Sequence, residues 1–285
     1  MKIAHLILAH RHPAQLERLI KALQHPSFHF YIHIDKKSDA SPFQYLFDYK
    51  TVFPVHQRTK VYWAAYGTIQ ATINGFREML PKGYDYINVI SAQDFPLRSA
   101  DDIYRYIRDR NGKEFITCHS IDVEWKEAAS RVRNYHLINW QIPGRHRLEN
   151  WMNRVLPPRK FPIPEHKIVG RANWFTLSKE AVHYSLDFID RHPELVRYYK
   201  YCWGADEFIF STILYNSYFK ERIVDNLVYV DWSGPKTGHP RILGAEDFGK
   251  LKASDKLFAR KFDMDKDSAI FSLLEDWIKM NQLTT

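Results

Sequence analysis

The chain has 285 residues, and its 41 Lys and Arg against 33 Asp and Glu give a formal net charge of +8. Hydrophobic residues make up 45% and charged residues 26%, which excludes disordered and collagen-like chains. Two cysteines, Cys118 and Cys202, are too few for a disulfide framework and favour a reducing compartment. No apolar run reaches the roughly 18 residues of a membrane span, and the apolar N-terminus lacks a signal-peptide cleavage site. We therefore expect a cytoplasmic protein, attached at most peripherally to the inner face of a membrane.

The first 120 residues alternate between expected strands and expected helices. Near-continuous apolar runs predict buried strands at 2–9, 28–34, 51–55, 84–90 and 114–118. Apolar residues at helical spacing predict helices at 68–80, at 99–107 and from Pro13 onward. Ser99 and Asp102 form a capping box at the start of one of them. This alternation indicates an α/β fold with a mostly parallel central sheet and helices on both faces.

Two carboxylates follow expected strands closely. Asp35 comes directly after the strand at 28–34, and Asp94 comes shortly after the strand at 84–90. In sheets of this kind, ligands bind beyond the carboxyl ends of the strands. We therefore expect both residues at a ligand site.

The middle of the chain differs in composition from both flanks. Residues 126–167 hold nine Lys and Arg against three Glu, which accounts for +6 of the net charge. With Trp140, Trp151 and five prolines in the same region, this predicts a long irregular insertion at 121–170 and not a separate domain. The whole chain is then one domain, with halves at 1–120 and 171–285. The basic segment either faces an anionic membrane or an acidic glycan, or is a solvated loop.

Regular structure is expected to resume after this insertion. Strands are predicted at 172–177 and 227–230, and helices at 178–190, 206–215 and 269–280.

Glu207 is a candidate general base. It lies in the first turn of an expected apolar helix, where a carboxylate also stabilises the helix dipole without any catalytic role. Trp203 and Phe208 flank it, and partial desolvation by these rings raises the pKa of a carboxylate toward the range useful for proton transfer.

Arg260 and Lys261 lie between the aromatic residues Phe258 and Phe262. Such a pair is either an ordinary basic surface pair or a clamp for a diphosphate, with a planar guanidinium and a point charge as donors. Lys236, His239 and Arg241 are close enough in sequence to add to such a clamp.

The run from Asp263 to Asp267 matches an Asp-x-Asp sequence and the start of a calcium loop, but it lacks the glycine and the distal glutamate of an EF-hand. A charged entry to the following helix is the alternative. The sequence contains no zinc-binding spacing, no Walker motif, no GxGxxG and no GxSxG. These absences argue against zinc enzymes, P-loop proteins, dinucleotide-binding proteins and α/β-hydrolases.

Eight segments, taken together and in order, resemble the core-2/I-branching β-1,6-N-acetylglucosaminyltransferase family, which also includes the peptide O-xylosyltransferases. They span nearly the whole chain, and they are AHRH at 9–12, YIHIDKKS at 31–38, VYW at 61–63, ISAQDFPL at 90–97, GRANWFTL at 170–177, ADEF at 205–208 with DW at 231–232, and LFARKFD at 257–263.

The resemblance implies a GT-A type fold and an inverting transfer from a UDP-sugar to a hydroxyl, without a metal. On this reading, Asp35 contacts the uridine, Glu207 is the catalytic base, and basic side chains neutralise the leaving diphosphate. The residues 1–120 then form the nucleotide-binding half and 171–285 the acceptor and catalytic half. The nucleotide-sugar-binding residues implied are His10, Asp35, Trp63, Asp94, Arg241, Arg260 and Lys261. The acceptor-binding residues implied are Asn173, Trp174 and Trp232.

The sequence departs from the family pattern at a few positions. Ala64 and Ala65 follow Trp63 where relatives often carry two glycines, Gly67 replaces a common serine, and Asn173 replaces Gln or Asp. The membrane anchor and disulfides of eukaryotic members are also missing, so the chain resembles compact bacterial members that build surface polysaccharides. The expected partners are UDP-N-acetylglucosamine or UDP-xylose, a glycan or lipid-linked glycan acceptor, and a membrane surface that contacts 126–167.

Two other functions fit parts of the sequence. A catalytically inactive sugar-binding or nucleotide-binding relative would share the fold, although the joint presence of Glu207, Arg260 and Lys261 argues against it. A nucleic-acid-binding protein would suit the basic composition, but its motifs are missing and the charge is confined to one insertion.

Overall fold

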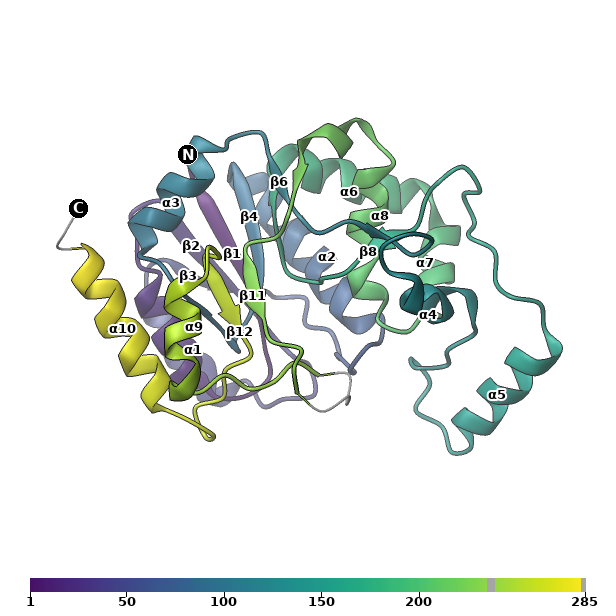
Figure 1. The fold of residues 1–285 in the computed structure, drawn as a ribbon, viewed down its shortest axis with the longest axis horizontal. Coiled ribbons are helices and arrows are strands. Elements are labelled where there is room, and N and C mark those ends of the chain that lie inside the picture. The colour runs from purple at the N-terminus through teal and green to yellow at the C-terminus, as the bar shows by residue number, and fades with distance from the viewer. Residues whose placement is uncertain (235–238, 283–285) are drawn as a thin grey trace. The chain divides into compact units, whose positions relative to one another are not determined.

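The fold was obtained as a computed structural model that describes residues 1–234 and 239–282 (Figure 1). The chain divides into two compact units that interleave along the sequence. Unit 1 comprises 1–56, 84–112 and 227–285, and unit 2 comprises 57–83 and 113–226. These boundaries differ from the expected succession of 1–120, 121–170 and 171–285, because the chain enters each unit more than once.

Unit 1 is built on parallel strands, as the apolar runs predicted. The strands pair in the order β4 (Tyr86–Ser91), β1 (Ile3–Ala9), β2 (Phe28–Ile34) and β3 (Val52–Pro54). In the register, Leu8 lies beside His33 on one side and beside Ser91 on the other. The carboxyl ends of β1, β2 and β4 therefore meet at one edge, where His10, Asp35 and Ala92 follow.

Two helices of unit 1, α1 and α3, begin at the residues that the sequence predicted. Pro13 opens α1, and the Ser99 hydroxyl accepts a hydrogen bond from the Asp102 amide at the start of α3. The unit contains α1 (Pro13–Ala22), α3 (Ala100–Asp109), α9 (Phe248–Ala253), α10 (Ala269–Gln282) and 3-10 turns at Ser41–Asp48 and Ala245–Asp247. A small second sheet has the order β11 (Val228–Val230), β12 (Phe258–Arg260) and β5 (Asp94–Pro96).

Unit 2 combines short strands with most of the remaining helices. Its strands pair as β10 (Ile223–Val224), β6 (Glu114–Phe115) and β9 (Phe175–Ser178), with β7 (His119–Ser120) and β8 (Val169–Gly170) as a separate pair. Its helices are α2 (Gly67–Met79), α4 (Ala129–Arg133), α5 (Arg145–Val155), α6 (Lys179–Arg191), α7 (Pro193–Tyr199) and α8 (Ile209–Tyr215). Its 3-10 turns are Leu80–Lys82, Lys126–Ala128, Ala205–Glu207 and Tyr218–Arg222. The predicted α/β class with a mostly parallel central sheet is confirmed by the strand pairings.

Two expectations about unit 2 were wrong in detail. The helix expected at 206–215 is a 3-10 turn at Ala205–Glu207 followed by α8 from Ile209, so Glu207 precedes the helix and does not lie in its first turn. The insertion expected to be irregular contains α4 and α5. Three of its cations also bind protein groups: Arg131 binds Glu207, Arg133 binds Asp122 and Arg159 donates to backbone carbonyls.

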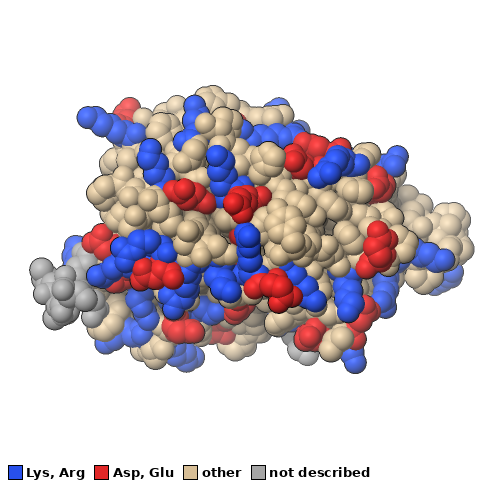
Figure 2. Space-filling model, turned by 90° about the horizontal axis from the view of Figure 1, so that it is seen from above, with Lys and Arg blue, Asp and Glu red and all other residues tan. Residues whose placement is uncertain are grey.

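Cys118 and Cys202 are both free thiols. Within the described part of the chain, every helix is too short or too polar to span a bilayer. Figure 2 shows one face of the molecule, on which basic and acidic side chains are intermixed. Intermixed charge differs from the basic stripe that is typical of nucleic-acid-binding surfaces.

Candidate active site

The residues singled out by sequence divide between the two units. Unit 1 holds His10, Asp35, Asp94, Trp232, Arg241, Arg260 and Lys261. Unit 2 holds Trp63, Asn173, Trp174 and Glu207. Lys236 lies outside the described residues.

In unit 1, the small sheet places Arg260 against Asp94. The two residues are register partners of antiparallel β12 and β5, and the Arg260 Nε lies 2.9 Å from Asp94 Oδ1. Asp94 is fully buried and also accepts hydrogen bonds from the Ser91 amide and hydroxyl, each at 2.9 Å. Burial raises the pKa of Asp94, and Arg260 and Ser91 oppose that rise. Asp94 therefore fixes the orientation of the Arg260 guanidinium.

Lys261 lies in a group of cations. Burial is the largest cause that lowers the pKa of Lys261, and repulsion from Arg260 and Arg11 lowers it further. Among the described residues, no carboxylate lies within ion-pair distance of its ammonium. A bound anion would supply the opposite charge that stabilises the charged form of such a lysine.

Two histidines belong to the same group. Burial lowers the pKa of His10, with further lowering by Arg11 and Lys261. Burial also lowers the pKa of His239, followed by Lys261 and Arg260. We call His10, Arg11, His239, Arg260 and Lys261 the basic cluster. Because the pKa of both imidazoles is lowered, the positive charge of this cluster near neutral pH comes from its arginines and Lys261, and such a group of cations is a receptor for an anion.

Backbone and side-chain bonds fix the basic cluster to the edge of the parallel sheet. The buried Gln15 on α1 donates from Nε2 to the carbonyls of Ala92 (2.8 Å) and Phe262 (3.2 Å), and its Oε1 accepts from the Met264 amide (2.9 Å). The segment that carries Lys261 is thereby tied to the residue that follows β4.

Asp35 lies beside His10 at the ends of β2 and β1, as the strand pattern predicted. The Asp35 amide donates to the Ala9 carbonyl at 2.8 Å, and the Ser38 hydroxyl donates to the His10 carbonyl at 2.8 Å. The Asp35 carboxylate accepts from the Lys37 amide at 2.9 Å and lies 3.4 Å from the Lys37 ammonium. A buried carboxylate in a rigid turn at this edge is suited to fix the position of a ligand hydroxyl or amide.

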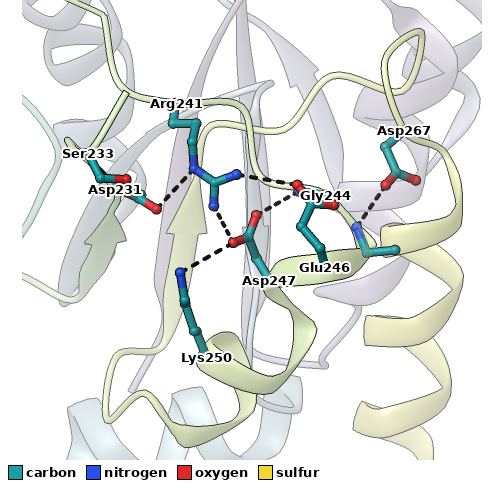
Figure 3. A network of polar contacts seen from close by, with 9 residues as sticks. Asp231, Ser233, Arg241, Gly244, Glu246, Asp247, Lys250 and Asp267 are labelled. Carbon is teal, nitrogen blue, oxygen red and sulfur yellow. Dashed lines mark hydrogen bonds and ion pairs between the residues drawn. The ribbon is translucent and has the colours of Figure 1, made fainter. Parts of the chain in front are cut away.

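Arg241 is surrounded by carboxylates (Figure 3). It lies 3.1 Å from Asp231 and 3.3 Å from Glu246, and it also pairs with Asp247. Hydrogen bonds from Ser233 and then Arg241 lower the pKa of Asp231 to about 2. Its contacts tie the segment near Asp231 to the turn before α9, which is a structural task. Its expected contact with the nucleotide sugar stays a prediction.

The acidic run at 263–267 takes part in several protein contacts. Asp263 pairs with Arg11 at 2.7 Å, and Asp267 accepts from the amides of Ala269 and Ile270 at the start of α10. His12, Asp263 and Asp265 each place one ligand atom within 4.8 Å of the others, the spacing of a cation site. Because Arg11 already neutralises Asp263, a metal ion there would have to compete with the guanidinium.

In unit 2, Glu207 is held by a close approach between two backbone segments. The Arg171 amide donates to the Glu207 carbonyl at 3.2 Å. A Cβ atom on the preceding Gly170 would lie 2.1 Å from that carbonyl oxygen. Gly170 is therefore needed because the two backbone segments approach so closely, and not because of a special torsion angle. This close approach fixes the position of the Glu207 backbone, from which the carboxylate extends.

The Glu207 carboxylate is paired with an arginine held between aromatic rings. Arg131 Nη1 donates to Glu207 Oε2 at 2.9 Å. The Arg131 guanidinium carbon lies 4.4 Å from the Trp203 ring centroid and 5.1 Å from that of Trp125. The Glu207 side chain is 22% exposed. One carboxylate oxygen is thus fixed by Arg131 while part of the group remains open to solvent.

The environment of Glu207 suits proton transfer near neutral pH. Burial and then the neighbouring Asp206 raise its pKa to about 7, while Arg131 and Arg171 oppose the rise. The aromatic flank predicted from sequence is present, because Phe208 is buried and stacks on Trp125 at 4.9 Å. A carboxylate with this pKa can accept a proton from a bound hydroxyl at pH 7.

The remaining candidates in unit 2 differ in exposure. Asn173 Nδ2 donates to Asp206 Oδ2 at 3.0 Å, next to Glu207. Trp174 is buried, whereas Trp63 is 50% exposed and packs edge-to-face on Trp203 with centroids 4.9 Å apart. Trp63 therefore belongs to the surroundings of Glu207. Trp232, in unit 1, is 55% exposed, and its expected contact with the acceptor stays a prediction.

Ala64 adopts φ 59°, the left-handed region that favours glycine. This conformation accounts physically for the glycine that the family pattern has at this position.

Two residues of these sites were not among the predicted site residues. Arg11 lies within the AHRH segment, so its position next to His10 was available as a signal. Arg131 is 76 residues from Glu207 in sequence and carries no local motif. Only the fold brings it to the carboxylate.

Sequence similarity to one protein family extends over most of the chain. The model described as "Branch: Core-2/I-Branching enzyme" matches residues 3–252. The chain belongs to the Core-2/I-Branching enzyme family. This membership was predicted from the sequence and is confirmed.

The curated proteins similar to this chain include xylosyltransferases. Human xylosyltransferase 2 is 27% identical over 305 residues, covering 96% of this chain and 33% of the human protein. Xylosyltransferase 1 from Rattus norvegicus is 26% identical over 311 residues, covering 99% of this chain and 36% of the rat protein. The chain thus spans about a third of the length of these curated relatives. Apo mouse xyloside xylosyltransferase 1 aligns with 90% of this chain and 96% of that chain at 9% identity and a TM-score of 0.42, too weak to bear on activity.

Proposed function

We propose that this Core-2/I-Branching protein is an inverting glycosyltransferase that works without a metal ion. It moves N-acetylglucosamine or xylose from a UDP-sugar to a hydroxyl of a glycan acceptor, free or lipid-linked, in surface polysaccharide synthesis. The names of the relatives favour xylose, and the name of the family favours a branching transfer. The observation that carries the proposal is the Glu207–Arg131 pair, a positioned carboxylate with a pKa near 7.

Glu207 is the proposed base. The acceptor hydroxyl attacks the anomeric carbon of the donor from the face opposite UDP while its proton passes to the Glu207 carboxylate. The bond between the anomeric carbon and the diphosphate oxygen breaks, and its electrons leave with UDP. The proton then passes from Glu207 to solvent. One carboxylate is enough for this single displacement, because no covalent sugar–enzyme intermediate forms.

The basic cluster is the proposed stabiliser of the leaving diphosphate. Lys261 and Arg260 supply a point charge and a planar donor, whereas Arg11 is already paired with Asp263 and the lowered pKa of His10 leaves its imidazole largely neutral at pH 7. Preorganised cations stabilise the charge that develops on the leaving oxygen more than they stabilise the bound substrate. This is the task a divalent metal performs in other nucleotide-sugar enzymes. Asp35 is the proposed contact to the uridine.

The test is Glu207→Gln, which keeps the hydrogen bond from Arg131 but removes the base. We expect transfer from the UDP-sugar to fall by at least about 100-fold, the scale of general-base catalysis, while affinity for UDP stays within about twofold. The matched control is Glu221→Gln, the same change at an exposed position in unit 2, with full activity expected. A Glu207→Gln protein that transfers sugar at the wild-type rate would show that another group is the base.

A further inference from the structure

Exposed apolar side chains gather in one short stretch of the chain. Among the described residues, thirteen large hydrophobic side chains are exposed, and six of them fall within 140–156. They are Trp140, Ile142, Leu148, Trp151, Val155 and Leu156. Exposed hydrophobic residues are ordinary when scattered, but a contiguous group marks an interaction site.

Helix α5 carries the centre of this group. None of its residues from Arg145 to Val155 is buried. Figure 1 shows α5 apart from α4, α6, α7 and α8, the other helices of the second half of unit 2. A helix with this many apolar residues is normally stabilised by packing its apolar face on a core.

α5 instead turns polar residues toward its own unit. Glu149 Oε2 accepts from the Leu137 amide at 2.9 Å. Asn153, one turn later, accepts from the Tyr135 amide at 2.7 Å and donates to the Tyr135 carbonyl at 2.8 Å. Residues four apart lie on one face of a helix. The inner face of α5 is therefore anchored by hydrogen bonds to the segment around Tyr135.

The outer face is apolar with a basic flank. Leu148, Trp151 and Val155 follow the i, i+3, i+7 spacing of one helical stripe and are all exposed, Trp151 to 59%. Arg147 and Arg154 lie next to this stripe and are also exposed. The acidic residue of the helix, Glu149, lies on the inner face, so the outward charge is positive.

We propose that the outer face of α5 docks on an anionic lipid surface, with Leu148, Trp151 and Val155 inserted among the acyl chains and Arg147 and Arg154 at the headgroups. An apolar stripe beside arginines, with a tryptophan in it, has the chemistry of an interfacial amphipathic helix. The positive flank complements phosphate-bearing headgroups. A second copy of the chain would bring the same arginines together and would lack that complementarity.

This inference deepens the proposed function, since a protein held on a membrane meets a lipid-linked acceptor there. Its test does not depend on transfer. Binding of the full chain is measured by sedimentation with vesicles of phosphatidylcholine alone and of phosphatidylcholine with phosphatidylglycerol. We expect binding to the anionic vesicles that weakens with salt, and at least about tenfold weaker binding to the neutral ones.

Two variants locate the surface. Leu148→Ser/Trp151→Ser/Val155→Ser and Arg147→Gln/Arg154→Gln are each expected to bind anionic vesicles at least about tenfold less than wild type, with an unchanged melting temperature. The control Val123→Ser/Tyr218→Ser changes exposed apolar residues elsewhere in unit 2 and should bind as wild type.

Equal binding by wild type and the triple serine variant would overturn the proposal. A wild-type protein that binds no vesicles would also overturn it. If wild type is a dimer and the triple serine variant is a monomer, a second copy of the chain and not a lipid surface covers α5, which would overturn the proposal too. Glu207→Gln should bind vesicles as wild type does. A failure of catalysis and a failure of docking are thereby distinguished.

Discussion

At the scale of single residues, the base site depends on opposing effects on one carboxylate. Burial and Asp206 raise the pKa of Glu207, and Arg131 restrains the rise by pairing with Oε2. Trp125 and Trp203 hold the guanidinium in turn. The sequence predicted Glu207 and its aromatic flank because those residues are neighbours in the chain. It could not predict Arg131, which reaches the carboxylate only through the fold.

The rate of transfer should therefore depend on pH through Glu207. The ionised form is the base, so kcat is expected to rise with pH and level off above a midpoint of about 7. The profile is measured at saturating donor and acceptor between pH 5.5 and 9. A kcat that does not change across this range would show that ionisation of Glu207 does not control the rate.

The same group should make stability depend on pH. Its pKa is raised from 4.5 to about 7, so the folded state binds the Glu207 proton more tightly than the unfolded state does. The contribution of Glu207 to the free energy of unfolding is thus fully present below about pH 4.5 and is lost as pH rises through about 7. Urea unfolding at pH 5 and pH 8 measures the effect. Glu207→Gln should show a smaller loss than wild type between these values, and an identical loss would contradict the assignment.

Arg131 should act on the position and charge of Glu207. Arg131→Ala removes the cation that restrains the pKa, so the midpoint of the pH profile should move up by about 1 unit or more, and kcat at pH 7 should fall. Arg131→Lys keeps the charge, so its midpoint and its kcat at pH 7 should lie between those of Arg131→Ala and wild type. The matched control is Arg133→Ala, two residues away and paired with the exposed Asp122, with no shift expected. A lower kcat with an unmoved midpoint would assign Arg131 a purely structural role.

At the scale of elements, very short strands place the chemistry. β12 and β5 have three residues each and set Arg260 against Asp94, and β8 brings Gly170 onto the carbonyl of Glu207. Long apolar runs predicted β1, β2 and β4, and capping residues predicted the starts of α1 and α3. The short strands β5, β8 and β12 were not predicted, whereas β3 and β11, which are no longer, lie within the strands expected at 51–55 and 227–230. The break between the 3-10 turn at Glu207 and α8 was missed as well.

Gly170→Ala tests this placement. The added Cβ would lie 2.1 Å from the Glu207 carbonyl oxygen, so the Glu207 backbone must shift. We expect a loss of about 1–3 kcal/mol in the free energy of unfolding and a fall in kcat of at least about tenfold. Gly249→Ala in α9 meets no atom within 4 Å and should stabilise the protein by about 0.5–1 kcal/mol at full activity. Urea unfolding and initial rates measure both, and wild-type kcat in Gly170→Ala would contradict the account.

At the scale of the whole molecule, the net charge of a segment does not show where an anion binds, because many of its cations are already paired within the protein. Residues 126–167 account for most of the formal excess, yet Arg131 and Arg159 bind groups within the protein and α5 presents its arginines outward. The cations proposed to receive the diphosphate lie elsewhere, in unit 1. The sequence identified Arg260 and Lys261 through their aromatic flanks, but the surroundings that make Lys261 an anion receptor come from segments far apart in the chain.

Binding of the diphosphate by protein cations alone is measured most directly by the melting temperature of the protein with UDP. With UDP at about 100 times its dissociation constant in EDTA, wild type should gain about 2.7 kcal/mol and melt several degrees higher. Lys261→Ala should lose most of that shift, while Lys250→Ala, an exposed lysine of the same unit, should keep it. A shift that appears only when manganese replaces EDTA would contradict the account and would point to a metal ion bound by acidic residues such as Asp263 and Asp265.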